Sequence, residues 1–407
     1  MTSSYHLEDR NKNIPKLRFK GYNDEWKRVK TEEIFENISI KNNPLLPVLA
    51  VTQDKGVILR ESCGINIKYE NKSLKSYKIV KPGNFIISLR SFQGGLEYSE
   101  LEGIVSPAYT ILNNKQNISY DFFKYYFKTY NFIKSLNIAV EGIRDGKQIS
   151  YNSFKDIKIA FPSLPEQEKI ALFLTLIDKK IEKQKELVEL LKKYKRGLLS
   201  SIFSQNLRFK DNDGNDYPDW IEKTLGEITD NISYGLNAAS KKFDSKNKYI
   251  RITDIDETTG KYNNLDIVSP DCVLSDEYKL KINDLLFART GASTGKTYLY
   301  NENDGKMYFA GFLIKFSIKE EYYSNFIFYI TQTSKYKKWV SIMSTRSGQP
   351  GINAKEYSKY KFSCPVYNEQ VKISNIISKI DNIIEKANIL LDFYNDYKKG
   401  LLQKMFI

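Results

Sequence analysis

Residues 166–203 read EQEKIALFLTLIDKKIEKQKELVELLKKYKRGLLSSIF, and residues 369–406 read EQVKISNIISKIDNIIEKANILLDFYNDYKKGLLQKMF. Sixteen of these 38 positions are identical without a gap, at a constant offset of 203. The shared Glu-Gln, Ile-Asp, Ile-Glu-Lys and Gly-Leu-Leu steps are too many in register to come from helix-like composition alone. The chain therefore contains an internal repeat, and this repeat decides its architecture.

Both repeated segments have the pattern of a long amphipathic helix. Their apolar residues recur at intervals of three and four, and in the first copy this stripe runs from Ile170 to Ile202 and includes Tyr194. Pro165 indicates the first turn of the first helix, and Asn368 indicates the cap of the second. Each helix would be on the order of 57 Å long if it included most of its segment.

A long helix with one apolar stripe is only marginally stable alone, so we expect the two copies to pair as an antiparallel coiled coil. The alternative is that each helix packs only against its own globular domain. The residues predicted to pair are Ile177, Ile181, Val188, Leu191, Ile380, Ile384, Leu391 and Tyr394.

Weaker repeats precede each helix. LRFKGYNDEW (17–26) corresponds to LRFKDNDGNDYPDW (207–220), and YKIVKPGNFIISLRSFQGG (77–95) corresponds to YKLKINDLLFARTGASTG (278–295). We therefore expect an α+β protein with a pseudo-twofold repeat, in which two similar globular domains alternate with the two helices. The predicted segments are a first domain at 1–162, a helix at 163–205, a second domain at 206–365 and a helix at 366–407.

The composition favours a nucleic-acid partner. The 407 residues carry a formal net charge of +14, of which +11 lies in residues 1–206. The only histidine is His6, which disfavours imidazole chemistry and histidine-ligated metals. Cys63, Cys272 and Cys364 lack metal-site spacing, and no apolar stretch has the length of a membrane span, so we expect a cytoplasmic protein without a bound metal.

Two motifs raise the alternative of a stand-alone enzyme. GASTGKT (291–297) is similar to the phosphate loop of an NTPase, but Thr290 stands where that loop needs its first glycine. We therefore predict a turn followed by a strand. SPAY (106–109) is close to the loop with which adenine methyltransferases hold a flipped base, but Ala108 replaces the second proline. We predict a strand there, and no catalytic residue anywhere in the chain.

The repeated order of domains and helices, with LRF and Trp before each domain and PEQEKIA and GLLSSIF at the ends of the first helix, resembles the specificity subunit of Type I restriction-modification enzymes. The resemblance extends over nearly the whole chain. It implies two target recognition domains that each read half of a split site in double-stranded DNA, with the helices as a fixed spacer. It also implies two modification (methyltransferase) subunits and restriction (translocase/endonuclease) subunits as partners. S-adenosylmethionine, ATP and magnesium would then belong to those partners, with no cofactor in this chain.

The candidate DNA-reading residues lie in two loops that occur in both copies. They are Arg, Lys, Gln, Asn, Ser and Thr side chains, which suit base edges and phosphates, although each could equally be a solvated loop residue. The turn after the apolar strand contributes Arg90, Ser91 and Gln93, and Arg289, Thr290, Ser293 and Lys296. The Gly-Gln loop contributes Arg144, Lys147 and Gln148, and Arg346, Gln349 and Asn353. A third possibility is a repeat-built interaction protein whose positive charge is incidental.

Overall fold

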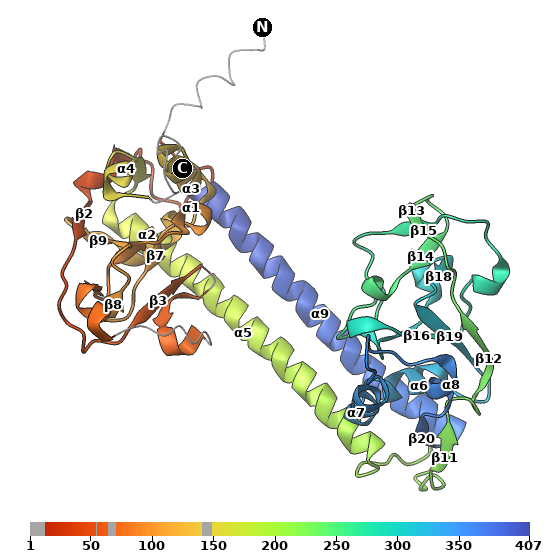
Figure 1. Ribbon diagram of the computed structural model, residues 1–407. Helices are drawn as coiled ribbons and strands as arrows, with labels where there is room; N and C mark the ends of the chain where they lie inside the picture. The colour runs from red at the N-terminus through yellow and green to blue at the C-terminus, as the bar shows by residue number, and fades with distance from the viewer. Residues whose placement is uncertain (1–12, 54, 64–70, 141–148) are drawn as a thin grey trace. The chain divides into compact units, whose positions relative to one another are not determined.

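The computed structural model describes residues 13–53, 55–63, 71–140 and 149–407. The chain divides into two compact units, the first containing residues 1–185 and 389–407 and the second residues 186–388 (Figure 1). Each unit combines a small globular domain with part of each of two long helices. In the part of the chain that the structure describes, no helix is long and apolar enough to cross a membrane.

The globular domain of the first unit contains short strands and short helices. The strands are β1 (Lys27–Lys30), β2 (Phe35–Ile38), β3 (Leu49–Thr52), β4 (Gly56–Leu59), β5 (Lys78–Val80), β6 (Phe85–Ile87), β7 (Glu97–Tyr98), β8 (Gly103–Val105), β9 (Thr110–Asn114) and β10 (Lys158–Phe161). The helices are α1 (Ser91–Gly94), α2 (Tyr120–Tyr126), α3 (Tyr130–Val140) and α4 (Tyr151–Lys155). Its main sheet is antiparallel, in the order β2-β9-β6-β7, and β1-β10, β3-β4 and β5-β8 form separate pairs.

The globular domain of the second unit repeats this scaffold. Its strands are β11 (Ile221–Thr224), β12 (Thr229–Tyr234), β13 (Ser240–Lys242), β14 (Lys248–Ile250), β15 (Val268–Pro270), β16 (Asp284–Ala288), β17 (Thr297–Leu299), β18 (Met307–Phe309), β19 (Leu313–Ile318) and β20 (Lys361–Cys364). Its helices are α6 (Ser324–Ile330), α7 (Ser334–Met343) and α8 (Ala354–Ser358). The sheet order β12-β19-β16-β17 and the pair β11-β20 match the first unit, which confirms the predicted repeat. The pair β14-β18 differs, because these strands are parallel whereas β5 and β8 are antiparallel.

Aromatic side chains from the sheet and from the helix that follows it, α2 in the first unit and α6 in the second, fill each core. In the first unit, Phe35 of β2 and Phe85 of β6 meet Phe127, which follows α2, with ring centroids 5.4 and 5.0 Å apart. In the second unit, Phe287 and Phe316 lie 5.0 Å apart in edge-to-face contact. This burial fixes the face of each sheet that points inward.

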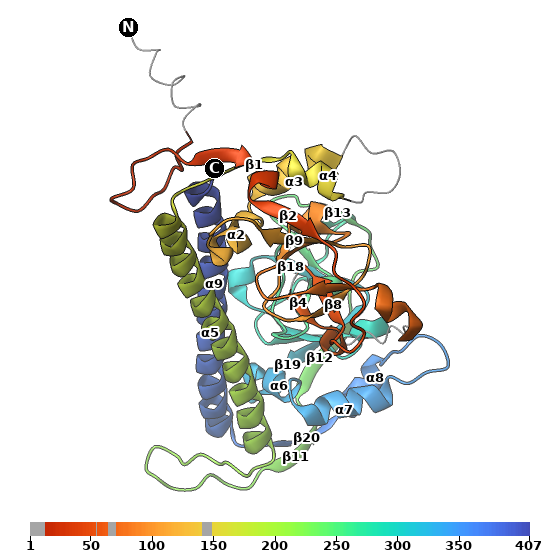
Figure 2. The same cartoon turned by 90° about the vertical axis from the view of Figure 1, so that its left-hand side faces the viewer.

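The two long helices are α5 (Leu164–Phe203) and α9 (Tyr367–Met405) (Figure 2). At 1.5 Å per residue, each is roughly 60 Å long. Pro165 lies in the first turn of α5, as predicted. The predicted cap at Asn368 was wrong, because α9 already begins at Tyr367.

Contacts within each unit establish that the helices run antiparallel. In the first unit, Leu174 of α5 and Met405 near the end of α9 belong to the same buried cluster. In the second unit, Ile202 near the end of α5 and Ile373 near the start of α9 share a cluster. The beginning of each helix therefore packs beside the end of the other, which confirms the antiparallel pairing.

The predicted apolar stripe is largely withdrawn from solvent. Among the residues predicted to pair, those that are buried are Ile181, Val188, Ile380 and Ile384. Those that are half-buried are Ile177, Leu191, Leu391 and Tyr394. The assignment of Tyr194 to this stripe was wrong, because its side chain is 60% exposed. Which of the eight predicted side chains contact one another stays a prediction.

Candidate nucleic-acid interface

In the second unit, the two loops that the sequence singled out lie against each other. The turn between β16 and β17 and the loop after α7 are joined by an isolated bridge between Thr290 and Gly351. The amide of Gly291 donates to the carbonyl of Pro350 at 2.9 Å, and the amide of Ile352 donates to the carbonyl of Arg289 at 3.0 Å. Loops about 60 residues apart in sequence thus form one surface of Arg, Lys, Gln and Thr side chains.

The GASTGKT stretch is a hairpin turn. The antiparallel strands β16 and β17 pair Phe287 with Thr297, so the stretch leads into a strand and not into the helix of a phosphate loop. The amide of Gly295 donates to the carbonyl of Ala288 at 3.0 Å, and the amide of Lys296 donates to the carbonyl of Ser293 at 3.0 Å. Both amides are occupied within the turn, and the predicted turn and strand are confirmed.

Arg289 is held at the root of this turn by an aromatic ring. Its guanidinium lies 4.9 Å from the ring centroid of Tyr234, the last residue of β12. The hydroxyl of Tyr234 accepts a hydrogen bond from the amide of Ala354 at 3.2 Å, which ties the ring to the start of α8. Among the described residues, the buried Nε of Arg289 has no hydrogen-bond partner. The arginine is therefore oriented through its planar face, and sequence analysis did not single out Tyr234.

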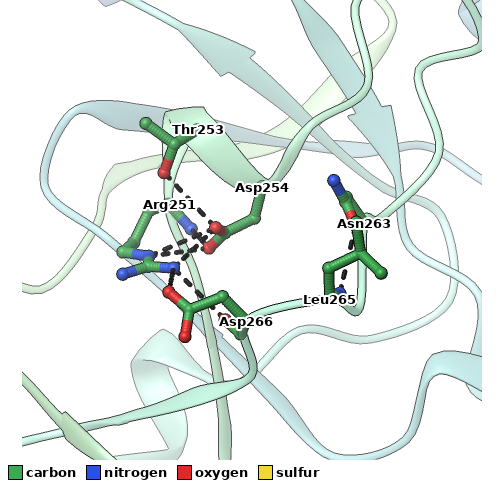
Figure 3. A network of polar contacts seen from close by, with 6 residues as sticks. All are labelled: Arg251, Thr253, Asp254, Asn263, Leu265 and Asp266. Carbon is green, nitrogen blue, oxygen red and sulfur yellow. Dashed lines mark hydrogen bonds and ion pairs between the residues drawn. The ribbon is translucent and has the colours of Figure 1, made fainter. Parts of the chain in front are cut away.

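Lys296 faces a carboxylate across the surface. Its Nζ lies 3.4 Å from Glu257, whose side chain is 82% exposed, so the pair contributes little to stability and can exchange for a phosphate. Glu257 belongs to a loop that Arg251 stabilises. The Arg251 guanidinium donates to Asp254 at 2.8 Å and to Asp266 at 3.0 Å (Figure 3). Hydrogen bonds to Asp254 outweigh burial and raise the pKa of Arg251, which stays charged within the loop.

Side chains in the loop after α7 differ in how far they are already engaged in hydrogen bonds. Arg346 donates to Glu356 at 2.6 Å and to the carbonyls of Met343 and Thr345, while Gln349 is exposed. Asn353 caps α8, because its side-chain oxygen accepts from the amide of Glu356 at 2.9 Å. Asn353 is exposed and its side-chain oxygen serves as a helix cap, while its role in base reading stays a prediction. Its counterpart at the repeat offset is Ser150, which caps α4 in the same way.

In the first unit, the turn after β6 is only partly available. Arg90 and Gln93 are exposed, and the carbonyl of Arg90 accepts from the side chain of Gln53. Ser91 is completely buried, and its hydroxyl accepts from the amide of Ser88 at 2.9 Å, so we withdraw it from the DNA-reading set. The second predicted loop of this unit, with Arg144, Lys147 and Gln148, lies outside the described residues.

The remaining predicted residues are half-buried. Thr290 and Ser293 belong to the β16–β17 turn and are less accessible than Gln349. SPAY forms the turn between β8 and β9, because the amide of Tyr109 donates to the carbonyl of Ser106 at 3.1 Å. The predicted strand at SPAY was therefore wrong. Pro107 and Ala108 form a tight turn between the two strands.

Sequence analysis also missed two matched ion pairs that join the start of each domain to a long helix. Arg18 donates through two nitrogens to Glu166 of α5, both at 2.7 Å, and Glu166 is buried. Arg208 pairs with Glu369 of α9 at 3.1 and 3.0 Å, and the indole of Trp220 donates to the same carboxylate at 3.1 Å. The repeated LRF and EQ motifs were the available signal, because each supplies one partner.

A family model described as "Type I restriction modification DNA specificity domain" matches residues 23–192 and 210–391, which together make up most of the chain. The chain belongs to this family. One match lies in each half of the chain, so the DNA specificity domain occurs twice, as the repeat predicted.

Specificity subunits from other organisms are similar to this chain over long stretches of sequence. The Type I restriction enzyme MjaVIII specificity subunit of Methanocaldococcus jannaschii is 24% identical over 331 residues, which cover 78% of this chain and 76% of the relative. The Type I restriction enzyme StySPI specificity subunit of Salmonella potsdam is 23% identical over 267 residues, covering 62% of this chain and 58% of the relative. The crystal structure of the Type I restriction-modification system S subunit from M. genitalium has a similar fold, with a TM-score of 0.54 and 16% identity, over 97% of this chain and 99% of that one.

Proposed function

We propose that this protein is the specificity subunit of a Type I restriction-modification complex and that each globular domain reads one half of a split DNA site. The observation that carries this proposal is the duplication of one sheet-and-loop scaffold beside an antiparallel helix pair, in a chain of the DNA specificity family. Two recognition domains joined by stiff helices can bind one duplex only at a set separation and helical phase. The number of unread base pairs between the half-sites is then fixed by protein geometry.

The side chains that remain available suit this role. We infer that Arg90 and Gln93 in the first domain, and Arg289, Arg346 and Gln349 in the second, include the base readers. Arginine pairs with guanine and glutamine with adenine in the major groove. Lys296 would contact phosphate, and the net charge of +14 would supply the sequence-independent attraction.

We infer that the chemistry belongs to partner subunits and that this chain has none of its own. The occupied amides of the GASTGKT turn and the tight SPAY reversal support this allocation. S-adenosylmethionine would then bind the modification subunits, while ATP and magnesium would bind the restriction subunits. The complex would act on chromosomal DNA in the cytoplasm.

The long helices offer two equivalent surfaces for the modification subunits. On α5, Leu187, Leu190 and Tyr194 are 44, 63 and 60% exposed, and they share one helical face. The residues 203 positions later on α9 are also apolar and exposed, namely Leu390, Phe393 and Tyr397. Because the patches repeat, we propose that they bind two copies of one partner.

These docking patches can be tested by purification with the modification subunit. Wild-type protein should bind two copies, whereas Leu190→Asp or Phe393→Asp alone should each leave one. The control Lys193→Asp changes an exposed charge on α5 and should retain two copies. Retention of two copies by the Leu190→Asp, Phe393→Asp double variant would refute the assignment.

The proposed function itself is tested by DNA binding of the reconstituted complex. We expect tight binding only to duplexes that carry both half-sites at one gap, with affinity that falls steeply as salt rises. The alternative, a stand-alone NTPase or DNA methyltransferase that uses the GASTGKT or SPAY loop, predicts that the purified chain binds ATP or S-adenosylmethionine tightly. Such binding would overturn the proposal.

A further inference from the structure

Two clusters of three side chains, one in each unit, have the same chemistry and the same connections. In the first unit, the hydroxyl of Tyr125 donates to Oδ2 of Asp178 at 2.8 Å, and Nζ of Lys398 lies 2.6 Å from Oδ1 of the same carboxylate. In the second unit, Tyr329 donates to Oδ2 of Asp381 at 3.0 Å, and Nζ of Lys195 lies 2.6 Å from Oδ1. We name these the Tyr-Asp-Lys clusters, and the DNA interface does not use them.

Each cluster joins three different elements. Tyr125 is on α2 of the first domain, Asp178 is on α5 and Lys398 is on α9. In the second cluster the helices exchange roles, since Asp381 is on α9 and Lys195 is on α5. One carboxylate thus holds a domain helix with one oxygen and the opposite long helix with the other. The two Asp residues and the two Lys residues are each 203 positions apart, so the clusters follow the repeat.

The tyrosine in each cluster is buried, so its hydroxyl needs a hydrogen-bond partner, which is the aspartate in both clusters and additionally Thr175 of α5, at 3.3 Å, in the first. Tyr125 is 5% exposed and Tyr329 is 4% exposed. Each lysine also lies over the tyrosine ring, with Nζ 5.4 Å from the Tyr125 centroid and 5.6 Å from that of Tyr329. Burial, followed by the neighbouring aspartate, raises the pKa of Tyr329 well above its ordinary value, so the hydroxyl remains a donor.

A second polar contact on each domain helix strengthens the attachment. The amide of Ser119, which caps α2, donates to the side chain of Gln167 on α5 at 3.0 Å. The amide of Tyr323, which precedes α6, donates to Gln370 on α9 at 2.9 Å. Gln167 and Asp178 are about 16 Å apart along α5 at 1.5 Å per residue. Two separated contacts on the same helix, together with the buried cluster that the domain shares with α5 and α9, fix its angle.

We propose that the Tyr-Asp-Lys clusters are positioning sites that set the angle of each recognition domain on the paired helices and thereby restrict the protein to a single gap between half-sites. This inference rests on the proposed function. It assigns the residues neither to base reading nor to catalysis. A domain released from its cluster still recognises its bases, but it reaches half-sites at neighbouring gaps.

The test uses the complete reconstituted complex and duplexes whose gap is the preferred length or one base pair shorter or longer. The variants are Tyr125→Phe, Tyr329→Phe and their combination, because phenylalanine keeps the buried ring and removes only the hydroxyl. Tyr130→Phe is the matched control, since Tyr130 is on α3 and is 69% exposed. Methylation rate is measured at each gap, and discrimination against a single wrong base is measured within each half-site.

In the double variant, we expect the ratio of the methylation rate at the correct gap to the rate at a neighbouring gap to fall roughly tenfold or more. A change of this size corresponds to the loss of a hydrogen bond to a charged group. Discrimination within each half-site should change less than about twofold, and the control should match wild type. A merely structural loss would lower all rates together. If the double variant does not fold, each single variant should still relax the gap preference.

A folded variant that is as strict about the gap as wild type would refute the positioning role. A wild-type complex without a preferred gap would instead refute the proposed function, so the two failures are distinguishable.

Discussion

Replacement of Glu166 by Gln should destabilise the first unit more than any similar change on the surface of α5. The Glu166 carboxylate is buried and receives two hydrogen bonds of 2.7 Å from Arg18, whose side chain is only 11% exposed. The same hydrogen bonds raise the pKa of Arg18, so the guanidinium stays charged at every accessible pH. Gln keeps the shape and one acceptor oxygen but leaves this buried cation without its counter-charge.

The expected cost follows from this geometry. Removal of one partner from a buried pair costs about 3–5 kcal/mol, and the remaining acceptor places Glu166→Gln near 3 kcal/mol. For a unit of this size, the melting temperature should fall by roughly 6–12 °C. Glu369→Gln should cost less, because Arg208 also donates to the carbonyls of Tyr217 and Pro218.

The assay is thermal unfolding of the full chain followed by circular dichroism. Glu168→Gln is the matched control, because Glu168 is exposed two residues away on the same helix and changes the net charge equally. We expect the control to melt within about 2 °C of wild type, since surface substitutions change stability by about 0.5 kcal/mol or less. Equal melting temperatures for Glu166→Gln and Glu168→Gln would refute the reasoning.

Three other predictions concern DNA. Lys296→Gln should reduce the magnitude of the slope of log affinity against log salt by about 0.9 without changing the preferred sequence, and Glu257→Gln should strengthen DNA binding. Anisotropy titrations measure this slope, and an unchanged slope for Lys296→Gln would show that Lys296 does not contact phosphate. Four residues inserted after Lys185 and after Asn388 would lengthen both helices by about 6 Å. Methylation assays should then show the gap longer by roughly one to two base pairs, and an unchanged gap would count against the spacer role. Exchange of residues 15–162 for those of another specificity subunit should alter one half-site in methylation sequencing, and alteration of both would contradict modular reading.

The repeat, the helices and their antiparallel pairing could be predicted because they depend on patterns that are visible in the sequence itself. Sixteen identities at one offset and an apolar stripe need no knowledge of distant contacts. The same holds for the GASTGKT turn, where one missing residue was enough to disfavour a phosphate loop. The repeat also indicated the two candidate loops of the second unit, whereas the contact between them is seen only in the structure.

What could not be predicted depends on contacts between distant segments. Ser91 and Gln93 are both polar residues in one turn, yet only the folded domain shows that Ser91 is buried. Asn353 has the chemistry of a base reader, but its side chain is used for the cap of α8. The Tyr-Asp-Lys clusters join residues more than 50 positions apart, and the identical Asp and Lys pairs were visible without indicating their partners.

The most direct test of split-site reading is sequencing of the methylated adenines in the host genome with and without this gene. We predict that deletion abolishes methylation at one motif made of two short specific halves separated by a constant number of unspecified bases. Loss of an uninterrupted motif, or an unchanged methylation pattern, would contradict the account.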